Sequence, residues 1–130
     1  MDEQGNSPLL TVGSVTQDDV VVVVVAGEVD MDTGELIHAE LTARLDLSPP
    51  ALVVDLAGVV FFGSAGIALL LEAKQRTDDL GVRLAVVAGR STLRPLAVTG
   101  VGKLFSLAET RADAIRMVHQ RELPGTKVGS

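Results

Sequence analysis

The chain has few residues whose type and spacing suit catalysis or metal binding. Each of its two histidines, His38 and His119, falls on a predicted helix and has no partner at the spacing that metal ligands need. A solvated helix position is the ordinary setting for such a histidine. The chain contains no cysteine, which excludes disulfides, thiolate metal sites and a cysteine nucleophile. No local motif indicates a Ser-His-Asp site.

Two further motifs have structural explanations. Segment 98–104 is a poor match to a phosphate-binding loop, because Ala97 stands where the first glycine belongs and Leu104 replaces Ser or Thr. A helix C-cap followed by a turn explains its glycines better. The acidic pairs Asp18–Asp19 and Asp78–Asp79 predict turns, since Asp bonds its own backbone there. We therefore expect a binding protein rather than an enzyme, with no catalytic residue, metal site or cofactor.

One hydroxyl has a more informative setting. Ser64 follows Gly63 at or beside the start of a predicted helix over 64–76, and Gly66 follows two residues later. Because these glycines add little bulk, another protein could approach the backbone closely. The Ser64 oxygen could be a plain N-cap that accepts a first-turn N–H, which contributes about 1 kcal/mol. It could also be a group that a partner recognises, and the two roles can coexist.

The segment around Ser64 predicts a buried strand, a turn and a buried helix. Residues 51–56 form the strand, and Ser48-Pro49-Pro50 before it ends the preceding helix. The uncharged stretch 56–71 is interrupted by glycines and is shorter than the roughly 20 apolar residues of a membrane span. We expect no membrane segment.

The other elements alternate strands with helices. The valine run Val20–Val25 predicts a strand buried on both faces, either at the centre of the sheet or available for edge pairing. Further strands are expected at 9–15, 82–88 and 104–107, and further helices after Asp32, after Ser91 and after Thr110. This order, β-β-α-β-α-β-α-β-α, predicts an α/β fold. Its mixed, mostly parallel sheet would have about five strands, with an antiparallel first hairpin and about four helices.

Residue spacing predicts where the helices start and which of their faces lie against the core. Asp32 with Glu35 has the spacing of a capping box for the first helix, and Thr110 with Asp113 caps the last. The residues expected on one side of each helix, in chain order, are Ile37, Leu41 and Leu45; Ile67, Leu70, Leu71 and Lys74; Leu93, Leu96 and Ala97; and Ile115, Val118 and Leu123.

Composition sets the function classes that remain. The 130 residues include 17 acidic and 11 basic side chains, a formal charge of −6, and neither Trp nor Tyr. An acidic chain without an aromatic stacking platform is not expected to bind nucleic acid. One domain over 9–122 is expected, with flexible tails at 1–8 and 123–130. The polar N-terminus is no signal peptide, so we expect a cytoplasmic protein that is a monomer or a weak dimer.

Segment 52–71, which reads LVVDLAGVVFFGSAGIALLL, closely resembles the central segment of STAS domains of bacterial anti-sigma factor antagonists. That family has a buried strand, a short hydrophobic bend, and Asp-Ser-Ser/Ala-Gly-Leu/Ile opening a helix. Gly27-Glu28-Val29-Asp30 with Thr33 is a second match, and segments 81–84 and 93–101 also fit. The resemblance covers roughly residues 9–120 and implies a STAS-like fold.

The resemblance also implies a protein-binding switch. Family antagonists bind an anti-sigma factor that is also a serine kinase, and so release a sigma factor. The kinase phosphorylates the serine that matches Ser64, which ends binding, and a serine phosphatase restores it. The partner-binding residues expected around Ser64 are Glu28, Asp30, Asp32, Thr33, Phe62, Gly63, Ala65, Gly66 and Ile67.

Elementary electrostatics predicts how a phosphate would act at Ser64. It would add about −1.5 to −2 charges. The start of a helix tolerates that charge, so we expect a local loss of affinity rather than unfolding. Glu28, Asp30 and Asp32 would add repulsion if they face the partner; otherwise they are solvated residues at a strand end and a helix cap.

Four alternatives stay open from the sequence. Gly63 stands where the family usually has Asp, so Ser64 could be unmodified in a constitutive antagonist, or modified by a divergent kinase. The chain could instead be a STAS module of another signalling or transport assembly, and a small α/β enzyme has the least support.

Phe61 and Phe62 point oppositely on an extended chain. We expect Phe61 in the core and Phe62 exposed beside a partly exposed Ile67.

Overall fold

The computed structural model of the chain describes residues 6–7 and 9–120. The strands are β1 (Asn6–Ser7), β2 (Leu10–Gln17), β3 (Val20–Val29), β4 (Ala51–Phe62), β5 (Arg83–Val87) and β6 (Leu107–Ala108). The helices are α1 (Gly34–Leu45), α2 (Ser64–Leu80), α3 (Arg90–Thr99) and α4 (Arg111–Gln120), with a 3-10 turn η1 (Val101–Leu104). No helix in this part of the chain is long and apolar enough to cross a membrane.

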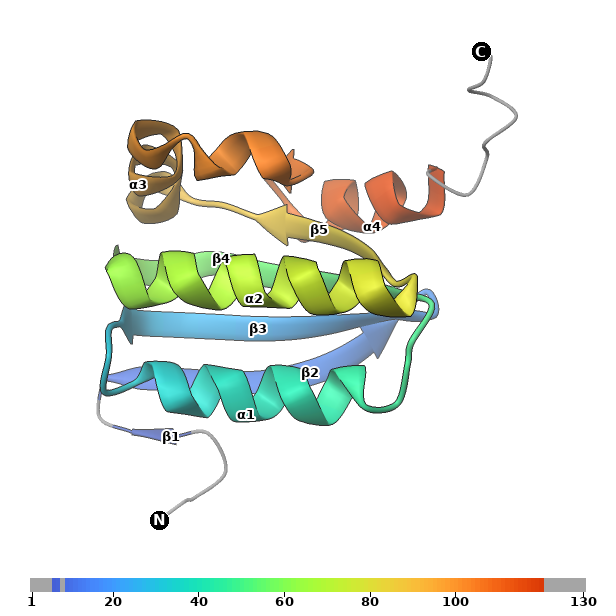
Figure 1. Cartoon of the computed structure of the whole chain (residues 1–130), viewed down its shortest axis with the longest axis horizontal. Coiled ribbons are helices and arrows are strands. Elements are labelled where there is room, and N and C mark those ends of the chain that lie inside the picture. The colour runs from blue at the N-terminus through green and yellow to red at the C-terminus, as the bar shows by residue number, and fades with distance from the viewer. Residues whose placement is uncertain (1–5, 8, 121–130) are drawn as a thin grey trace.

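The strands form one mixed sheet in the order β1-β2-β3-β4-β5-β6. β1, β2 and β3 pair antiparallel, and β3 to β6 pair parallel (Figure 1). The predicted α/β architecture with its antiparallel first hairpin is confirmed. The valine run of β3 lies inside the sheet, between β2 and β4, rather than at an edge.

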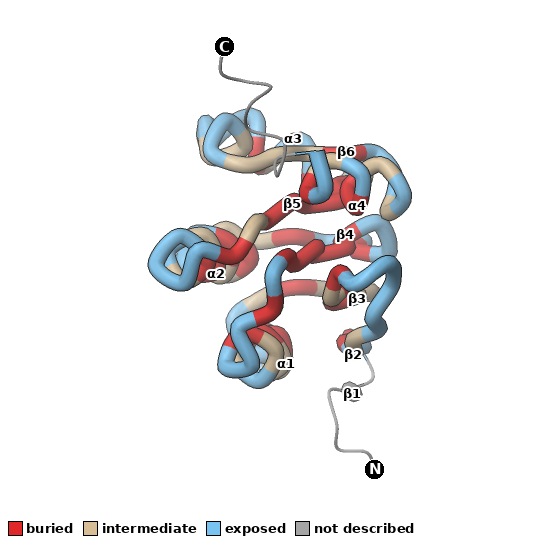
Figure 2. Tube along the Cα trace, turned by 90° about the vertical axis from the view of Figure 1, so that its right-hand side faces the viewer, coloured by how far each residue is buried: buried red, intermediate tan, exposed pale blue. Residues whose placement is uncertain are grey.

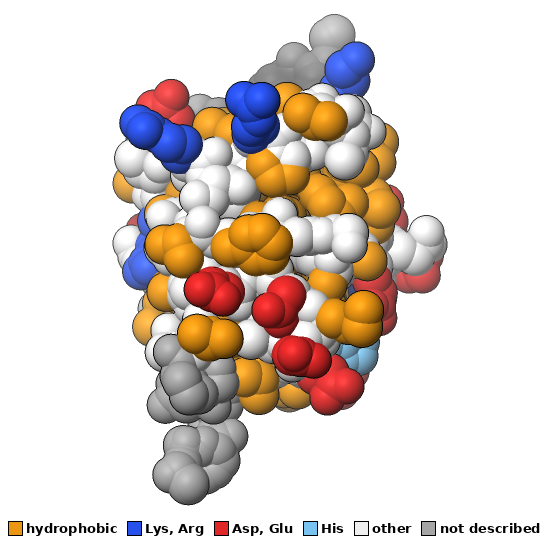
Figure 3. Space-filling model, turned by 90° about the vertical axis from the view of Figure 1, so that its left-hand side faces the viewer, with side chains coloured by type: hydrophobic (Ala, Val, Ile, Leu, Met, Phe, Trp, Pro, Cys, Tyr) orange, Lys and Arg blue, Asp and Glu red, His pale blue; other side chains and the backbone are white. Residues whose placement is uncertain are grey.

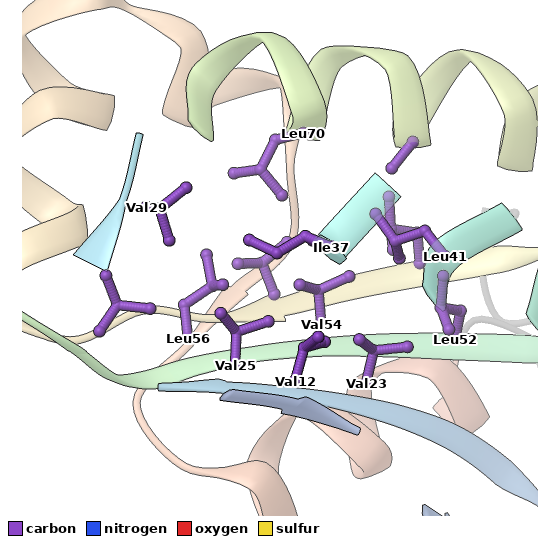
Figure 4. Close-up of a cluster of buried hydrophobic side chains, with 14 of the residues drawn as sticks. Val12, Val23, Val25, Val29, Ile37, Leu41, Leu52, Val54, Leu56 and Leu70 are labelled. Atoms are coloured by element: carbon purple, nitrogen blue, oxygen red, sulfur yellow. The ribbon is translucent and has the colours of Figure 1, made fainter. Parts of the chain in front are cut away.

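Helices cover both faces of the sheet, and each face has its own apolar core. α1 and α2 lie on one face and α4 on the other (Figure 2). The larger core joins Ile37 and Leu41 of α1 and Leu70 of α2 to the strand residues Val25 and Val54 (Figure 4). A smaller core, which includes Ile115 and Val118, packs under α4. β3 and β4 are buried from both sides, as their near-continuous β-branched sequences predict.

Several helix predictions are confirmed and others are wrong. Ile37, Leu41 and Leu45 form the buried face of α1, as predicted. On α2 the buried residues are Gly66, Leu70, Ala73 and Thr77, whereas Leu71 is exposed. On α3 the buried residues are Thr92 and Leu96, and Leu93 and Ala97 are exposed.

Element boundaries also differ from expectation. Residues 101–104 form η1, so the last strand is shorter and later than predicted. Asp78 and Asp79 lie in the last turn of α2 rather than in a loop, where they bond Lys74 and Gln75. Residues 6–7, predicted as part of a tail, pair with β2. The predicted tails at 1–5, at residue 8 and at 123–130, and the inward position of Leu123, lie outside the described residues.

Other turns match their sequence-based explanations. Asp18 and Asp19 have φ of 53° and 68° in the β2–β3 turn, a conformation that Asp tolerates. Gly100 ends α3 with φ of 77°, so it is a helix C-cap and not part of a phosphate-binding loop.

Candidate functional site

The site is built where β3 and β4 end and where α1 and α2 begin. Val29 at the end of β3 pairs with Phe62 at the end of β4, and the Gly63 N–H donates to the Val29 carbonyl oxygen at 3.0 Å. This bond fixes the chain just before α2. Ser64 is therefore held at the end of the sheet by the pairing of its two central strands.

The two adjacent phenylalanines have the opposite exposure to the one predicted. Phe62 is 6% exposed and belongs to the larger core, whereas Phe61 is 52% exposed. The reason is that β4 does not bend away after Leu56 but continues to Phe62. Phe62 then packs beneath α2, so close to Gly66 that a Cβ on this glycine would lie 2.5 Å from the ring. The Phe61 side chain is left at the surface.

Two irregularities in β4 bring further apolar groups to the surface. β4 contains an extra residue between Asp55 and Gly58 and another between Val59 and Phe61, relative to β3. Such bulges change which side chains face the core. Val60, in the second irregularity, is 68% exposed.

Ser64 is an accessible hydroxyl at the first residue of α2. Its side chain is exposed and makes no hydrogen bond to any residue that the structure describes. The N-cap is Gly63, which has no side-chain cap, so the interpretation of Ser64 as a plain N-cap is wrong. The Gly63 carbonyl oxygen accepts the N–H groups of Gly66 and Ile67. The hydroxyl itself is free to meet another molecule.

The side chain of one aspartate, Asp30, accepts hydrogen bonds from the backbone of the acidic loop between β3 and α1. Asp30 Oδ1 accepts the N–H groups of Asp32 at 2.9 Å and Thr33 at 3.0 Å. The backbone hydrogen bond from Thr33 lowers the pKa of Asp30 below its ordinary value, because it favours the charged form. Thr33 Oγ1 donates to the Glu28 carbonyl oxygen at 2.7 Å. The loop is thus held while its carboxylates stay near solvent.

The predicted capping box at the start of α1 is wrong. The N-cap residue is Thr33 rather than Asp32, and it makes no side-chain cap hydrogen bond. Asp30 Oδ1 instead accepts the N–H groups of Asp32 and Thr33 just before the helix, and Asp32 itself is exposed.

Exposed apolar side chains lie among these acids. Met31 is 83% exposed between Asp30 and Asp32, and Phe61 is the strand partner of Glu28. Figure 3 shows this end of the molecule, where hydrophobic side chains alternate with Asp and Glu. We call the surface formed by residues 28–32 and 60–65 the Ser64 face.

The predicted site residues take different positions on this face. Ser64 and Asp32 are exposed; Glu28, Asp30, Gly63, Ala65 and Ile67 are half-buried; Thr33, Phe62 and Gly66 are buried. The buried residues support the face from below and do not form its surface. Sequence reasoning missed Met31, Val60 and Phe61, which supply the exposed apolar area. The one local signal of this exposed apolar area was a Met between two aspartates, at residue 31.

Gly63 and Phe61 occupy the same small space. A Cβ on Gly63 would lie 3.1 Å from Cε2 of the Phe61 ring, which is tight enough that the ring would have to move. An Asp at this position, as in the family pattern, would therefore require the Phe61 ring to move by a few tenths of an ångström.

The histidines lie elsewhere and do not assemble a catalytic or metal site. His38 Nε2 lies 2.9 Å from Glu72 Oε2 between α1 and α2, and His119 Nε2 lies 3.1 Å from the Asp18 carbonyl oxygen. Within the described ranges no group of His, Asp and Glu could hold a metal ion.

Comparisons with known proteins identify a domain family and relatives that share one named role. The family model for the STAS domain matches residues 12–114. The anti-sigma-F factor antagonist RsfB of Mycobacterium tuberculosis is 33% identical over 107 residues, covering 82% of this chain and 87% of that protein.

Solved structures agree. An anti-sigma factor antagonist from Mycobacterium paratuberculosis superimposes with a TM-score of 0.77 at 36% identity, covering 87% of this chain and 97% of that one. The Bacillus cell fate determinant SpoIIAA in its phosphorylated form gives 0.63 at 21% identity, over 82% of this chain and 98% of that one. At that identity the second match shows the fold alone.

Proposed function

Because the chain belongs to the STAS domain family, we propose that it is an anti-sigma factor antagonist. It would bind an anti-sigma factor through the Ser64 face and so release a sigma factor, in the cytoplasm. The observation that carries this proposal is an exposed hydroxyl at the start of α2 that bonds none of the described residues, bordered by exposed apolar side chains and by an acidic loop held by hydrogen bonds. Two relatives above 30% identity are named as antagonists, which supports it.

The chemistry of the Ser64 face describes the partner surface that it fits. Exposed Met31, Val60 and Phe61 need an apolar recess, and the surrounding carboxylates of Glu28 and Asp32 need basic side chains at its rim. Full burial of a Phe side chain contributes about 1.5–3 kcal/mol. Phe61 starts half exposed, so its burial supplies about half of that, which is about three- to tenfold in affinity.

A pair of matched variants tests this contact. Phe61→Ser should weaken binding to the anti-sigma factor about three- to tenfold in calorimetric titration. Leu104→Ser is the control, because Leu104 is 51% exposed but lies on η1, away from the Ser64 face. Equal losses from the two variants, or no loss from Phe61→Ser, would count against the proposed surface.

We further propose that an anti-sigma factor with serine kinase activity phosphorylates Ser64 and that a serine phosphatase reverses this. The added charge lies at the amino end of α2, where the helix dipole tolerates it, so the fold should be retained. In a complex the same charge would meet a surface shaped for a small neutral group. A like-charge contact at 4 Å costs about 4 kcal/mol at an effective dielectric of 20.

Incubation with the kinase and labelled ATP tests the modification directly. Wild-type chain should take up label and Ser64→Ala should not, whereas label retained in Ser64→Ala would place the modification elsewhere. No label in either chain would favour an unphosphorylated protein, either a constitutive antagonist or, as a second candidate, a STAS interaction module of another assembly. Gly63 in place of the family Asp is the observation behind that candidate.

A further inference from the structure

The end of the molecule that carries the Ser64 face also carries exposed basic side chains. β3, β4 and β5 are parallel neighbours, so their carboxyl ends lie together, and α3 begins just after the end of β5. A Cβ on Gly89, the N-cap of α3, would lie 3.3 Å from the Ala57 carbonyl oxygen, so α3 starts against β4. Arg90 and Arg94, one helical turn apart on α3, are exposed. This end is therefore acidic beyond β3 and basic beyond β5.

The charged side chains at this end have no partners of opposite sign within the part of the chain that the structure describes. Asp32 and Glu35, just before α1 and in its first turn, are exposed and form no ion pair with a described residue. The same holds for Arg90 and Arg94. A surface with unpaired acids on one side and unpaired bases on the other is complementary to a copy of itself turned by 180°.

Exposed apolar side chains lie between and beside the two charged sets. Val60 is 68% exposed and Phe61 is 52% exposed at the end of β4, which lies between β3 and β5. Met31 is exposed beside the acids, and Leu93 is exposed beside the arginines of α3. Figure 3 shows this end with Asp and Glu gathered in its lower half, Lys and Arg at the top, and hydrophobic side chains between them.

We propose that a second copy of this chain docks on this end, about a two-fold axis that runs along the normal of the sheet and passes the end of β4. This rotation brings the end of β3 in one copy opposite the end of β5 in the other. Asp32 and Glu35 of each copy then face Arg90 and Arg94 of the other. The exposed end of β4 meets its own counterpart at the axis.

Apolar contact and charge have different parts in this dimer. Removal of Val60 and Phe61 from water supplies most of the attraction, because exposed ion pairs add little each. Each copy carries a net charge of −6, so two copies repel each other in most orientations. The opposed acids and arginines therefore select this orientation. An interface of about 1,200 Å² or less is weak, so the dimer depends on concentration.

The dimer has a consequence for binding at the Ser64 face. Residues 28–32 and 60–65 are covered by the second copy, so self-association and binding of another protein to this face exclude each other. This consequence rests on the proposed function, whereas the dimer itself does not.

Sedimentation equilibrium between about 0.01 and 1 mM tests the proposal. The average mass should rise toward that of a dimer and stop there. Arg90→Glu/Arg94→Glu and Asp32→Arg/Glu35→Arg should each remain monomeric, because like charges then face each other. An equimolar mixture of the two double variants should form dimers again, because every acidic set in a mixed pair faces a basic one.

Charge reversal at the opposite end of the molecule is the control. Arg116→Glu on α4 and Asp79→Arg in the last turn of α2 change the net charge in the same two directions at exposed positions. Both should dimerise like the wild type, and all the variants should retain its circular dichroism spectrum. If these controls also remain monomeric, net charge rather than this surface governs the mass, and the proposal is wrong.

Three other results would overturn the proposal. They are a constant monomer mass of the wild type up to about 1 mM, a mixture of the two double variants that stays monomeric, and dimers of either double variant alone. A mass that grows past the dimer would show head-to-tail contacts and exclude the two-fold arrangement. The experiment needs no anti-sigma factor, so its failure is distinct from a failure of the proposed function.

Discussion

Replacing Gly66 with alanine measures how closely α2 is held against the end of β4. A Cβ there would lie 2.5, 2.7 and 2.8 Å from three carbons of the Phe62 ring. Attractive carbon contacts lie at about 3.5–4.0 Å, and the buried ring has little room to move. Overpacking of this kind costs about 1–3 kcal/mol. Alanine gains at most about 1 kcal/mol over glycine in a helix, so Gly66→Ala should lower the free energy of unfolding by about 1–2 kcal/mol.

Urea unfolding is the assay, with Gly13→Ala as the matched control. A Cβ on Gly13 meets no atom within 4 Å, so that variant should be neutral or slightly stabilising. In a Phe62→Leu background the smaller side chain should reduce the cost of Gly66→Ala, because the two residues share the space. The reasoning is refuted if Gly66→Ala is as stable as wild type, or if its cost is the same in both backgrounds.

Two further predictions concern charged groups. The pKa of Asp30 is lowered in the folded state, so Asp30 stabilises the fold above the unfolded-state value of 3.8, and this contribution is lost as pH falls through the folded-state pKa. The gap in Tm between wild type and Asp30→Ala should narrow from neutral pH to about pH 3, and a constant gap would contradict the lowered pKa. Arg111→Ala leaves the buried Asp55 carboxylate without the Nε that lies 3.0 Å from its Oδ2, and should cost about 1–3 kcal/mol in urea unfolding. The control is removal of the exposed ion pair between Arg116 and Asp113, which should lower the free energy of unfolding by less than about 0.5 kcal/mol. Equal losses from the two changes would show that the burial of Asp55 is unimportant.

The sequence was sufficient to predict the order of the strands and helices from β2 to α4, although not β1 or η1, because that order depends on long periodic segments. The β-branched valine run favoured a buried strand, and the four-residue spacing of Ile37, Leu41 and Leu45 favoured a helix with one buried face, as the structure shows. The position of Ser64 at the start of α2 followed from the glycines beside it and from the resemblance to STAS domains.

The details of the site depend on contacts between segments distant in sequence. The exposure of Phe61 and the burial of Phe62 follow from how far β4 continues beside β3 and from the space beneath Gly66. Neither is visible in the local pattern. Asp30 could not be distinguished from Asp32 as the residue that bonds the free N–H groups before α1, since both have suitable spacing. Similarly, the apolar residues of α3 gave no indication that Leu93 would be exposed.

The affinity of the anti-sigma factor for unmodified and Ser64-phosphorylated chain, measured side by side by calorimetry, tests the central claim most directly. We predict tight binding of the unmodified chain and at least about a tenfold loss on phosphorylation, with unchanged circular dichroism spectra. Equal affinities would show that Ser64 is not part of the contact. A loss of affinity accompanied by loss of the folded spectrum would show that the phosphate acts by unfolding the chain, which would contradict a local effect at the Ser64 face.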